Sequence, residues 1–232
     1  MLYNRKTFGS YVRDNIEKSS RTASIFSIVL IDIDDFKLIN DVYGHHTADM
    51  VLKELSERLK KSLRRMDIPA KLGGDEFAVL LDLSIDTALA VAKRLINILS
   101  SEPVKIEDKE IPISVSAVVV SYPQDGTSEE ELITYAEYLM REVKRKGKGI
   151  VLSSEESPHK FPVVKELERS IMKSLEKSSV VPFYQEIIDL KDMSLFGFEV
   201  LMRIKFNGRF FSAEEFVDVA ERIGAMQKLR LF

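Results

Sequence analysis

Two adjacent carboxylates, Asp75 and Glu76, follow a pair of glycines in the stretch KLGGDEFAVLL, residues 71–81. Glycine reaches positive φ without steric cost, and a Gly-Gly pair between two short apolar runs is typical of a β-hairpin turn. Two interpretations stay open for this stretch by itself. The acids either face water at a tight turn, or they hold a divalent cation beside a substrate phosphate.

A second acidic group closes the apolar run IFSIVLIDID, residues 25–34. Asp32 and Asp34 alternate at its end, so their side chains are expected on opposite faces of a strand, with the Ile33 carbonyl between them. One aspartate and one carbonyl at a strand end form a hard oxygen site suited to Mg²⁺. The alternative is a solvated loop whose acids cap a helix.

Further polar side chains follow in the same stretch. Lys37 could reach a phosphate, while Asn40 and Asp49 offer the donor and acceptor groups that would bind a purine edge. If the fold brings Asp32 close to Asp75, the two carboxylates repel each other unless a divalent cation neutralises them. The pairing of two acidic clusters therefore favours a metal and nucleotide site over two unrelated turns.

The overall composition of the chain indicates which broad class of protein it belongs to. The 232 residues are 45% hydrophobic and 31% charged, with a net charge of −3 and no cysteine. No polybasic segment indicates nucleic-acid binding. No stretch approaches the ~18 apolar residues of a membrane span, and the first residues lack the apolar segment of a signal peptide. We expect a cytoplasmic domain with no nucleic-acid partner and no membrane contact.

The spacing of apolar residues predicts a domain over residues 1–153, whose helices and strands must position these carboxylates. Strands are expected at 25–34, 68–72, 77–82 and 150–152, with a hairpin over 104–122 turning at 107–109. Helices are expected at 4–18, 49–63, 86–99 and 128–146. Hairpins between helices predict an α+β fold with a central antiparallel or mixed sheet flanked by helices.

Composition changes at SSEESPHKFP, residues 153–162, which is polar with two prolines. We expect a linker and a helix over 154–178, and a further segment over 179–232. That segment contains two strand-like runs, 180–190 and 194–204. A helix is expected from Ser212, with Ser212 and Glu215 forming a capping box.

The motifs DIDDFKLINDVYGH…AD and KLGGDEF, in this order along the chain, resemble the GGDEF diguanylate cyclase family over residues 2 to about 152. The resemblance implies a palm-type sheet like that of nucleotide cyclases. It also implies that a homodimer condenses two GTP molecules into cyclic di-GMP, with Mg²⁺ or Mn²⁺ as cofactor. The implied metal ligands are Asp32, the Ile33 carbonyl and Asp75, with Glu76 at the catalytic edge.

Other roles follow from the same resemblance. Guanine would bind Asn40 and Asp49, and phosphates would bind Lys37, Lys144 and main-chain groups around Asp35 and Phe36. The RRMD stretch lies at the family's spacing for a product-inhibition site, which implies that Arg64 and Asp67 bind cyclic di-GMP. The helix dipole also favours basic residues such as arginine at a helix C-terminus, so an ordinary helix end is the alternative for that stretch.

This chain departs from the family pattern at Ala48, Val118, Glu137, Arg141 and Lys148. Lys148 stands where the family favours arginine, and it cannot make a bidentate phosphate contact. Two functions therefore stay open: an active cyclase, or a catalytically weak or silent module that binds GTP or cyclic di-GMP and regulates a larger signalling protein.

Residues 179–232 resemble the beginning of an EAL phosphodiesterase domain, whose fold is a TIM-like barrel. PFYQEIIDL and FEVLMR carry that resemblance. It implies a metal ligand at Glu199 and substrate contacts at Gln185 and Arg203. Because the strands that supply most of the metal ligands are not in this segment, we expect no phosphodiesterase activity from it.

Overall fold

The computed structural model describes residues 2–157, 171–172, 180–206, 209–213, 216–217, 220 and 224–225. The chain divides into two units, residues 1–160 and residues 161–232. We describe each unit by itself. The helix expected within 154–178 and Glu215 of the expected capping box lie outside the described residues.

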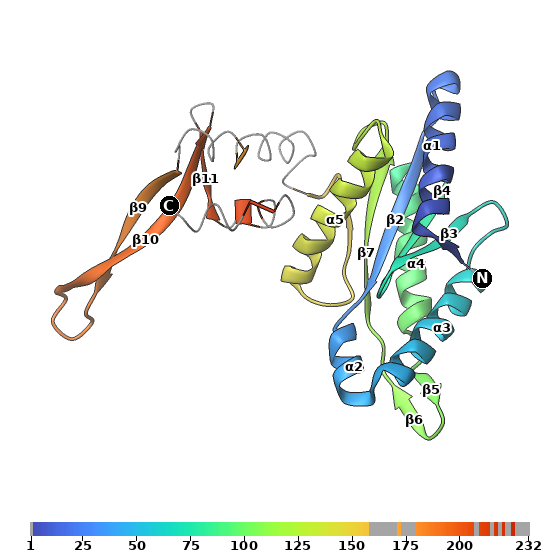
Figure 1. Ribbon diagram of the computed structural model, residues 1–232, viewed down its shortest axis with the longest axis horizontal. Helices are drawn as coiled ribbons and strands as arrows, with labels where there is room; N and C mark the ends of the chain where they lie inside the picture. Colours follow the sequence, from blue (N-terminus) through green and yellow to red (C-terminus); the bar gives the residue numbers. More distant parts are fainter. Residues whose placement is uncertain are drawn as a thin grey trace. The chain divides into compact units, whose positions relative to one another are not determined.

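The first unit contains both helices and strands (Figure 1). Its elements are, in order, β1 (Tyr3–Asn4), α1 (Arg5–Thr22), β2 (Phe26–Ile33), α2 (Phe36–Tyr43), α3 (His45–Lys61), β3 (Ile68–Gly73), β4 (Glu76–Leu81), α4 (Ile85–Ser100), β5 (Val104–Ile106), β6 (Lys109–Ile111), β7 (Val115–Tyr122), α5 (Glu129–Lys146) and β8 (Val151–Ser153).

Six of these strands form one sheet in the order β1-β3-β4-β2-β7-β8. The outer pairs β1–β3 and β7–β8 are parallel, and the inner pairs are antiparallel, so the sheet is mixed, as expected. The expected hairpin over 104–122 is different in detail: β5 and β6 pair only with each other, and β7 pairs with β2 and β8.

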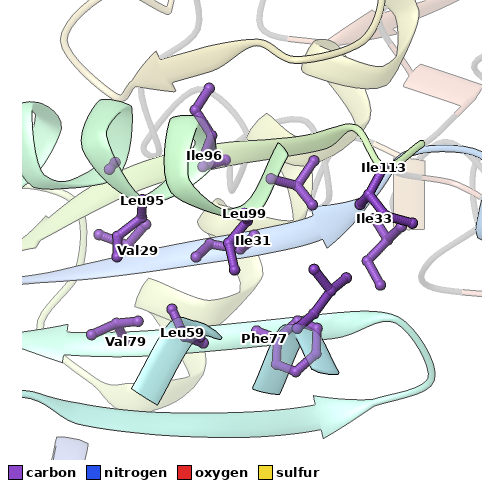
Figure 2. Packing of buried hydrophobic residues seen from close by; sticks show 14 of the residues in the cluster. Val29, Ile31, Ile33, Leu59, Phe77, Val79, Leu95, Ile96, Leu99 and Ile113 are labelled. Carbon is purple, nitrogen blue, oxygen red and sulfur yellow. The ribbon is translucent and has the colours of Figure 1, made fainter. Parts of the chain in front are cut away.

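Alternation along the strands separates the core into two faces. One face carries Val29, Ile31 and Ile33 of β2 and packs against α3 and α4, in a cluster that also contains Leu59, Phe77 and Leu95 (Figure 2). The other face packs against α5, which contacts β2, β7 and β8. Because side chains alternate with a period of two, Asp32 belongs to the α5 face.

Helix α2 was not expected from the sequence, which predicted a helix only from residue 49. Phe36, Ile39 and Tyr43 do recur at helical spacing and pack on the core, while Leu38 and Val42 are exposed. The helix has only eight residues, and an apolar pattern of that length cannot be assigned to a helix by periodicity alone. Gly44, at φ 82°, separates α2 from α3.

The second unit contains a three-stranded antiparallel sheet in the order β11-β10-β9. Its strands are β9 (Val180–Ile188), β10 (Leu195–Phe206) and β11 (Arg209–Ser212). The two expected strands are present. Ser212 ends a third strand, and the described residues directly after it, Ala213, Phe216, Val217 and Ala220, are helical, as expected. Apolar side chains are exposed on this sheet, including Tyr184, Phe198 and Val200.

Among the described residues, none of the helices is long and apolar enough to span a membrane.

Candidate active site

Three polar residues of neighbouring strands lie side by side at one end of the central sheet. Asp32 of β2 is opposite Glu76 of β4 and opposite Ser116 of β7 in the strand register. All three belong to the α5 face, because directly paired residues in an antiparallel ladder point the same way. The apolar part of these strands is therefore followed by a polar cluster at one end of the sheet.

The β3–β4 turn brings Asp75 to the same end of the sheet. Gly74 has φ 47°, a conformation that glycine adopts without strain. The amide of Ile33 donates to the carbonyl oxygen of Asp75 over 3.4 Å, which joins the turn to the end of β2. The structure therefore places the backbone of Asp75 next to Asp32 and Ile33, the two other residues predicted to hold a metal.

Asp34 lies just beyond β2 and is buried, with 2% of its side chain exposed. Its carboxylate accepts hydrogen bonds from Ser114 Oγ at 2.6 Å, Ser116 Oγ at 2.9 Å and the Gly149 amide at 2.9 Å. Lys144 Nζ donates to it as well, at 2.6 Å. The carboxylate of Asp34 thus fastens the end of α5 and the residues after it to the central strands.

Lys144 also forms an ion pair with Asp32. One ammonium therefore contacts both aspartates, and the prediction that alternation would direct Asp32 and Asp34 to opposite faces was wrong. The physical reason is that strand side chains alternate with a period of two, so Asp32 and Asp34, which are two residues apart, point to the same face. The phosphate contact predicted for Lys144 is not tested by this arrangement, in which its charge is neutralised by carboxylates.

The two aspartates differ in acidity. Burial raises the pKa of Asp32, and the charges of Asp75 and Asp34 raise it further, against the opposing effect of Lys144. Burial also acts to raise the pKa of Asp34, but hydrogen bonds from Lys144, Ser114, Gly149 and Ser116 outweigh it and leave that pKa below its ordinary value.

Glu76 is the third acid of the cluster. Burial raises its pKa, the charge of Glu137 on α5 raises it further, and Arg5 partly offsets both. Arg5 Nη2 lies 3.5 Å from Glu76 Oε2 and 3.5 Å from Glu137 Oε1. Glu137 was noted in the sequence only as a departure from the family pattern, and no contact between Arg5 and Glu76 was expected, because this contact depends on the packing of α1 and α5.

A cavity of about 270 Å³ opens beside the cluster. It is lined by side chains of α2, of the segment between β6 and β7, and of Lys148: Asp34, Asp35, Leu38, Ile39, Val42, Tyr43, Ile111, Pro112, Ser114 and Lys148. Lys148 forms an ion pair with Asp35, which adopts a left-handed conformation at the beginning of α2. The cavity is therefore apolar along α2 and charged where it meets the aspartates.

The predicted guanine and phosphate ligands lie on or near α2. Lys37 and Asp49 are exposed. Asn40 Oδ1 lies 3.0 Å from His45 Nδ1, and its amide nitrogen donates to the Phe36 carbonyl at 3.5 Å. Asn40, Asp49 and Lys37 are not among the residues that line the cavity beside the acidic cluster.

Arg64 and Asp67 close a turn between α3 and β3. The Asp67 carboxylate accepts from the Arg64 amide at 2.7 Å, and the Asp67 amide donates to the Arg64 carbonyl at 3.1 Å. The Arg64 side chain is exposed. Asp67 therefore holds the turn, and the guanidinium is left facing solvent.

The donor set at the sheet end fits a hard divalent cation. Two carboxylates with a backbone carbonyl are oxygen ligands, and Mg²⁺ is typically held by one or two carboxylates together with substrate phosphates. Among the described residues, no group of three or more His, Cys, Asp or Glu side chains is placed so that it could hold a metal ion.

Sequence reasoning did not find the partners of Asp34. Ser114 and Ser116 stand in and before an otherwise apolar strand, ISVSAVVV. Two hydroxyls in such a run are a signal of a buried polar partner. Which partner they serve depends on the β2–β7 register, since that register sets which residues of the two strands lie opposite each other.

Residues 1–149 match the family described as "Diguanylate cyclase, GGDEF domain". The bifunctional diguanylate cyclase/cyclic di-GMP phosphodiesterase MucR of Pseudomonas aeruginosa is 29% identical over 231 residues, which are 98% of this chain and 34% of MucR. Diguanylate cyclase A of Treponema denticola is 36% identical over 140 residues, 60% of this chain and 38% of that protein. The chain thus spans between 34% and 38% of the length of these relatives.

The fold is also that of a solved domain. The crystal structure of the GGDEF domain of YfiN (TpbB) from Pseudomonas aeruginosa superposes with a TM-score of 0.63 at 31% identity. The superposition covers 66% of this chain and 96% of that domain.

Proposed function

Since the chain belongs to the diguanylate cyclase GGDEF domain family over residues 1–149, we propose that it condenses two GTP molecules into cyclic di-GMP. The observation that supports this most directly is the sheet end, where Asp32, the Ile33 backbone, Asp75 and Glu76 come together. Relatives named as diguanylate cyclases match the same part of the chain.

In the proposed reaction, the 3′-hydroxyl of one GTP attacks the α-phosphorus of the other. A new O–P bond forms, the bond between the α-phosphorus and its bridging oxygen breaks, and pyrophosphate leaves. The hydroxyl proton is released to solvent. A second, identical step closes the ring, so each cyclic di-GMP is formed with two pyrophosphates. Alignment and charge neutralisation are the main demands of such phosphoryl chemistry.

Asp32, the Ile33 carbonyl and Asp75 are the residues that would hold Mg²⁺ or Mn²⁺. When bound, such an ion neutralises phosphate charge and orients the phosphate oxygens. Glu76 would act at the edge of the same cluster. Lys144 would exchange carboxylate contacts for phosphate contacts.

Substrate binding would use the residues of α2 and its surroundings. We propose that Asn40 and Asp49 bind guanine, and that Lys37 binds phosphate together with the amides near Asp35 and Phe36. The first amides of a helix have no partner within the helix and suit an anion. Because one domain would hold one GTP, the reaction requires a homodimer in which two sites face each other.

The Arg64–Asp67 turn supports a further part of the proposal, inhibition by the product. An exposed guanidinium on a turn that a carboxylate holds rigid suits the phosphates and guanine edge of cyclic di-GMP. A crystal structure of the DgcB GGDEF domain is described as a complex with c-di-GMP.

A regulatory role without turnover is the second candidate. The ion pair of Asp35 with Lys148 favours this role, because the Asp35 carboxylate neutralises an ammonium that would otherwise be available to a phosphate. Glu137 and Arg141 add to the departures from the family pattern. In that case the chain would bind GTP or cyclic di-GMP, and this binding would regulate another domain.

For the second unit we propose a relationship to the EAL phosphodiesterase domain. Glu199 pairs with Gln185 across β9 and β10, and Arg203 lies two residue pairs further along the same face. Relatives named as phosphodiesterases match this chain over 230 and 231 residues. These side chains alone would not hydrolyse cyclic di-GMP.

One assay separates the two candidates. The chain is incubated with GTP and Mg²⁺ or Mn²⁺, and nucleotides are separated by HPLC. Formation of cyclic di-GMP, lost in the Asp75→Ala variant, supports the cyclase. Binding of GTP or cyclic di-GMP by calorimetry without any product identifies the regulatory module.

A further inference from the structure

Arg5 is fixed at the beginning of α1 by its neighbours in the chain. Tyr3 and Asn4 form β1, which pairs in parallel with β3, with Asn4 opposite Lys71. The Asn4 side chain caps α1 by accepting from the Thr7 amide at 2.9 Å. The backbone of Arg5 is therefore tied to the strand that leads into the Gly-Gly turn.

The guanidinium of Arg5 contacts both sides of that turn. Its Nε donates to the Leu72 carbonyl at 3.4 Å, before the glycines, and Nη2 lies 3.5 Å from Glu76 Oε2, after them. The same Nη2 lies 3.5 Å from Glu137 Oε1 on α5. One side chain thus connects three segments: the end of β3, the beginning of β4 and α5.

These contacts add little to the stability of the fold. The Arg5 side chain is 56% exposed, and ion pairs exposed to water contribute little because solvent screens them. Their importance is local. Glu76 has the like charges of Glu137, Asp32 and Asp75 around it, so without a cation its carboxylate would be repelled from the sheet end.

We propose that Arg5 is a positioning residue, which holds the Glu76 carboxylate and the β3–β4 turn in place for the reaction. This inference rests on the proposed cyclase function. Arg5 does not belong to the acidic motif and is not a metal ligand. Its effect passes through Glu76 and through the backbone of Leu72.

The chain supplies a matched control in Arg13. Arg13 also lies on α1 and forms an ion pair with Glu129 of α5, so it connects the same two helices without touching the turn. Arg13→Gln therefore removes an α1–α5 ion pair of the same kind. A merely structural role of Arg5 would give both variants the same behaviour.

The first experiment compares the full chain with its Arg5→Gln, Arg5→Lys and Arg13→Gln variants in GTP turnover. Misplacing a reacting group by about 1 Å can reduce a rate a hundredfold, so we expect Arg5→Gln to lower kcat about tenfold or more. KM for GTP should change by less than about twofold, since a group that acts in the transition state affects kcat. Arg5→Lys should recover part of the rate, and Arg13→Gln should match the wild type.

A second comparison tests the route through Glu76. In a Glu76→Gln background, Arg5→Gln should cause a much smaller loss of kcat than in the wild type, because, of the contacts of Arg5 with the turn, only the one with Leu72 is then left to lose, and residues that share a contact are not additive. Equal kcat in Arg5→Gln and Arg13→Gln would overturn the inference. So would a full additional loss in the Glu76→Gln background.

Hydrogen exchange tests the same inference without turnover. The peptide covering residues 71–81 should exchange faster in Arg5→Gln than in the wild type, and Arg13→Gln should leave it unchanged. If the wild type makes no cyclic di-GMP, the proposed function fails while this measurement still decides the role of Arg5. Unchanged exchange in Arg5→Gln would then refute the inference.

Discussion

The ammonium of Lys144 forms an ion pair with the carboxylate of Asp32, a predicted metal ligand. The same ammonium is bound by Asp34, whose pKa lies below its ordinary value because of hydrogen bonds that outweigh its burial. A protein cation thus lies at the position where a metal ion is expected to act. With a metal ion bound as proposed, the two cations would compete for Asp32 until a nucleotide supplied phosphates for Lys144.

This competition predicts that Lys144→Gln binds Mn²⁺ more tightly than the wild type when no nucleotide is present. Attraction between neighbouring charges near a protein surface reaches ~4 kcal/mol, so a gain of about tenfold in affinity is expected. Paramagnetic resonance of free Mn²⁺ measures it. Lys146→Gln, in the same last turn of α5, is the control. Equal Mn²⁺ affinity in Lys144→Gln and the wild type would contradict the competition.

Asp75→Ala should abolish cyclic di-GMP synthesis and leave the fold intact. Asp75 lies at a turn and is only half-buried, so its removal opens no cavity and should cost little stability. Product formation by HPLC and the thermal unfolding midpoint check the two parts. Asp82→Ala, just past the opposite end of β4, is the matched control. Retained turnover in Asp75→Ala would exclude it as a metal ligand.

Asp34→Ala should destabilise the first unit strongly. It removes the acceptor of Lys144, Ser114, Ser116 and Gly149 and leaves buried donors without a partner. Breaking a buried charge pair in this way costs about 3–5 kcal/mol. Ser114→Ala, which removes a single hydrogen bond, should cost about 1 kcal/mol. Urea unfolding measures both, and similar values for the two variants would contradict the role of Asp34.

The contribution of Asp34 should also depend on pH. Its folded-state pKa is lowered from the usual 3.8, so the folded state favours the charged form. The stabilisation is therefore fully present above 3.8 and is lost as the pH falls through the lower folded-state pKa. The difference in unfolding free energy between wild type and Asp34→Asn should accordingly shrink in acid. A constant difference from pH 7 down to the acid limit would contradict it.

Arg64→Ala should weaken binding of cyclic di-GMP and increase cyclase output when product accumulates. A hydrogen bond to a charged group contributes about 1.5–3 kcal/mol, which corresponds to a loss of about 10–150-fold in affinity. Calorimetry with cyclic di-GMP measures it. The neighbouring exposed Arg65 provides the control variant Arg65→Ala. Equal affinities would show that Arg64 is an ordinary charged residue at the end of α3.

The sequence by itself determined the elements and the acidic motifs. Apolar spacing located β2, β4, α4 and α5 to within a few residues, because each buries a continuous stripe or a complete face. The Gly-Gly turn followed from local backbone chemistry, since Gly74 requires positive φ. Helix α2 was missed because it has only eight residues, too few for the helical spacing of Phe36, Ile39 and Tyr43 to be distinguished from a short apolar run.

Only the tertiary structure decided which charges meet. We expected Asp32 and Asp34 on opposite faces, but residues two apart in a strand share a face, and one lysine from α5 contacts both. Glu76 pairs with Arg5 of α1, and Arg5 also pairs with Glu137 of α5. Contacts of this kind depend on strand register and helix packing, which are set by the whole core and leave no local pattern in the residues that meet.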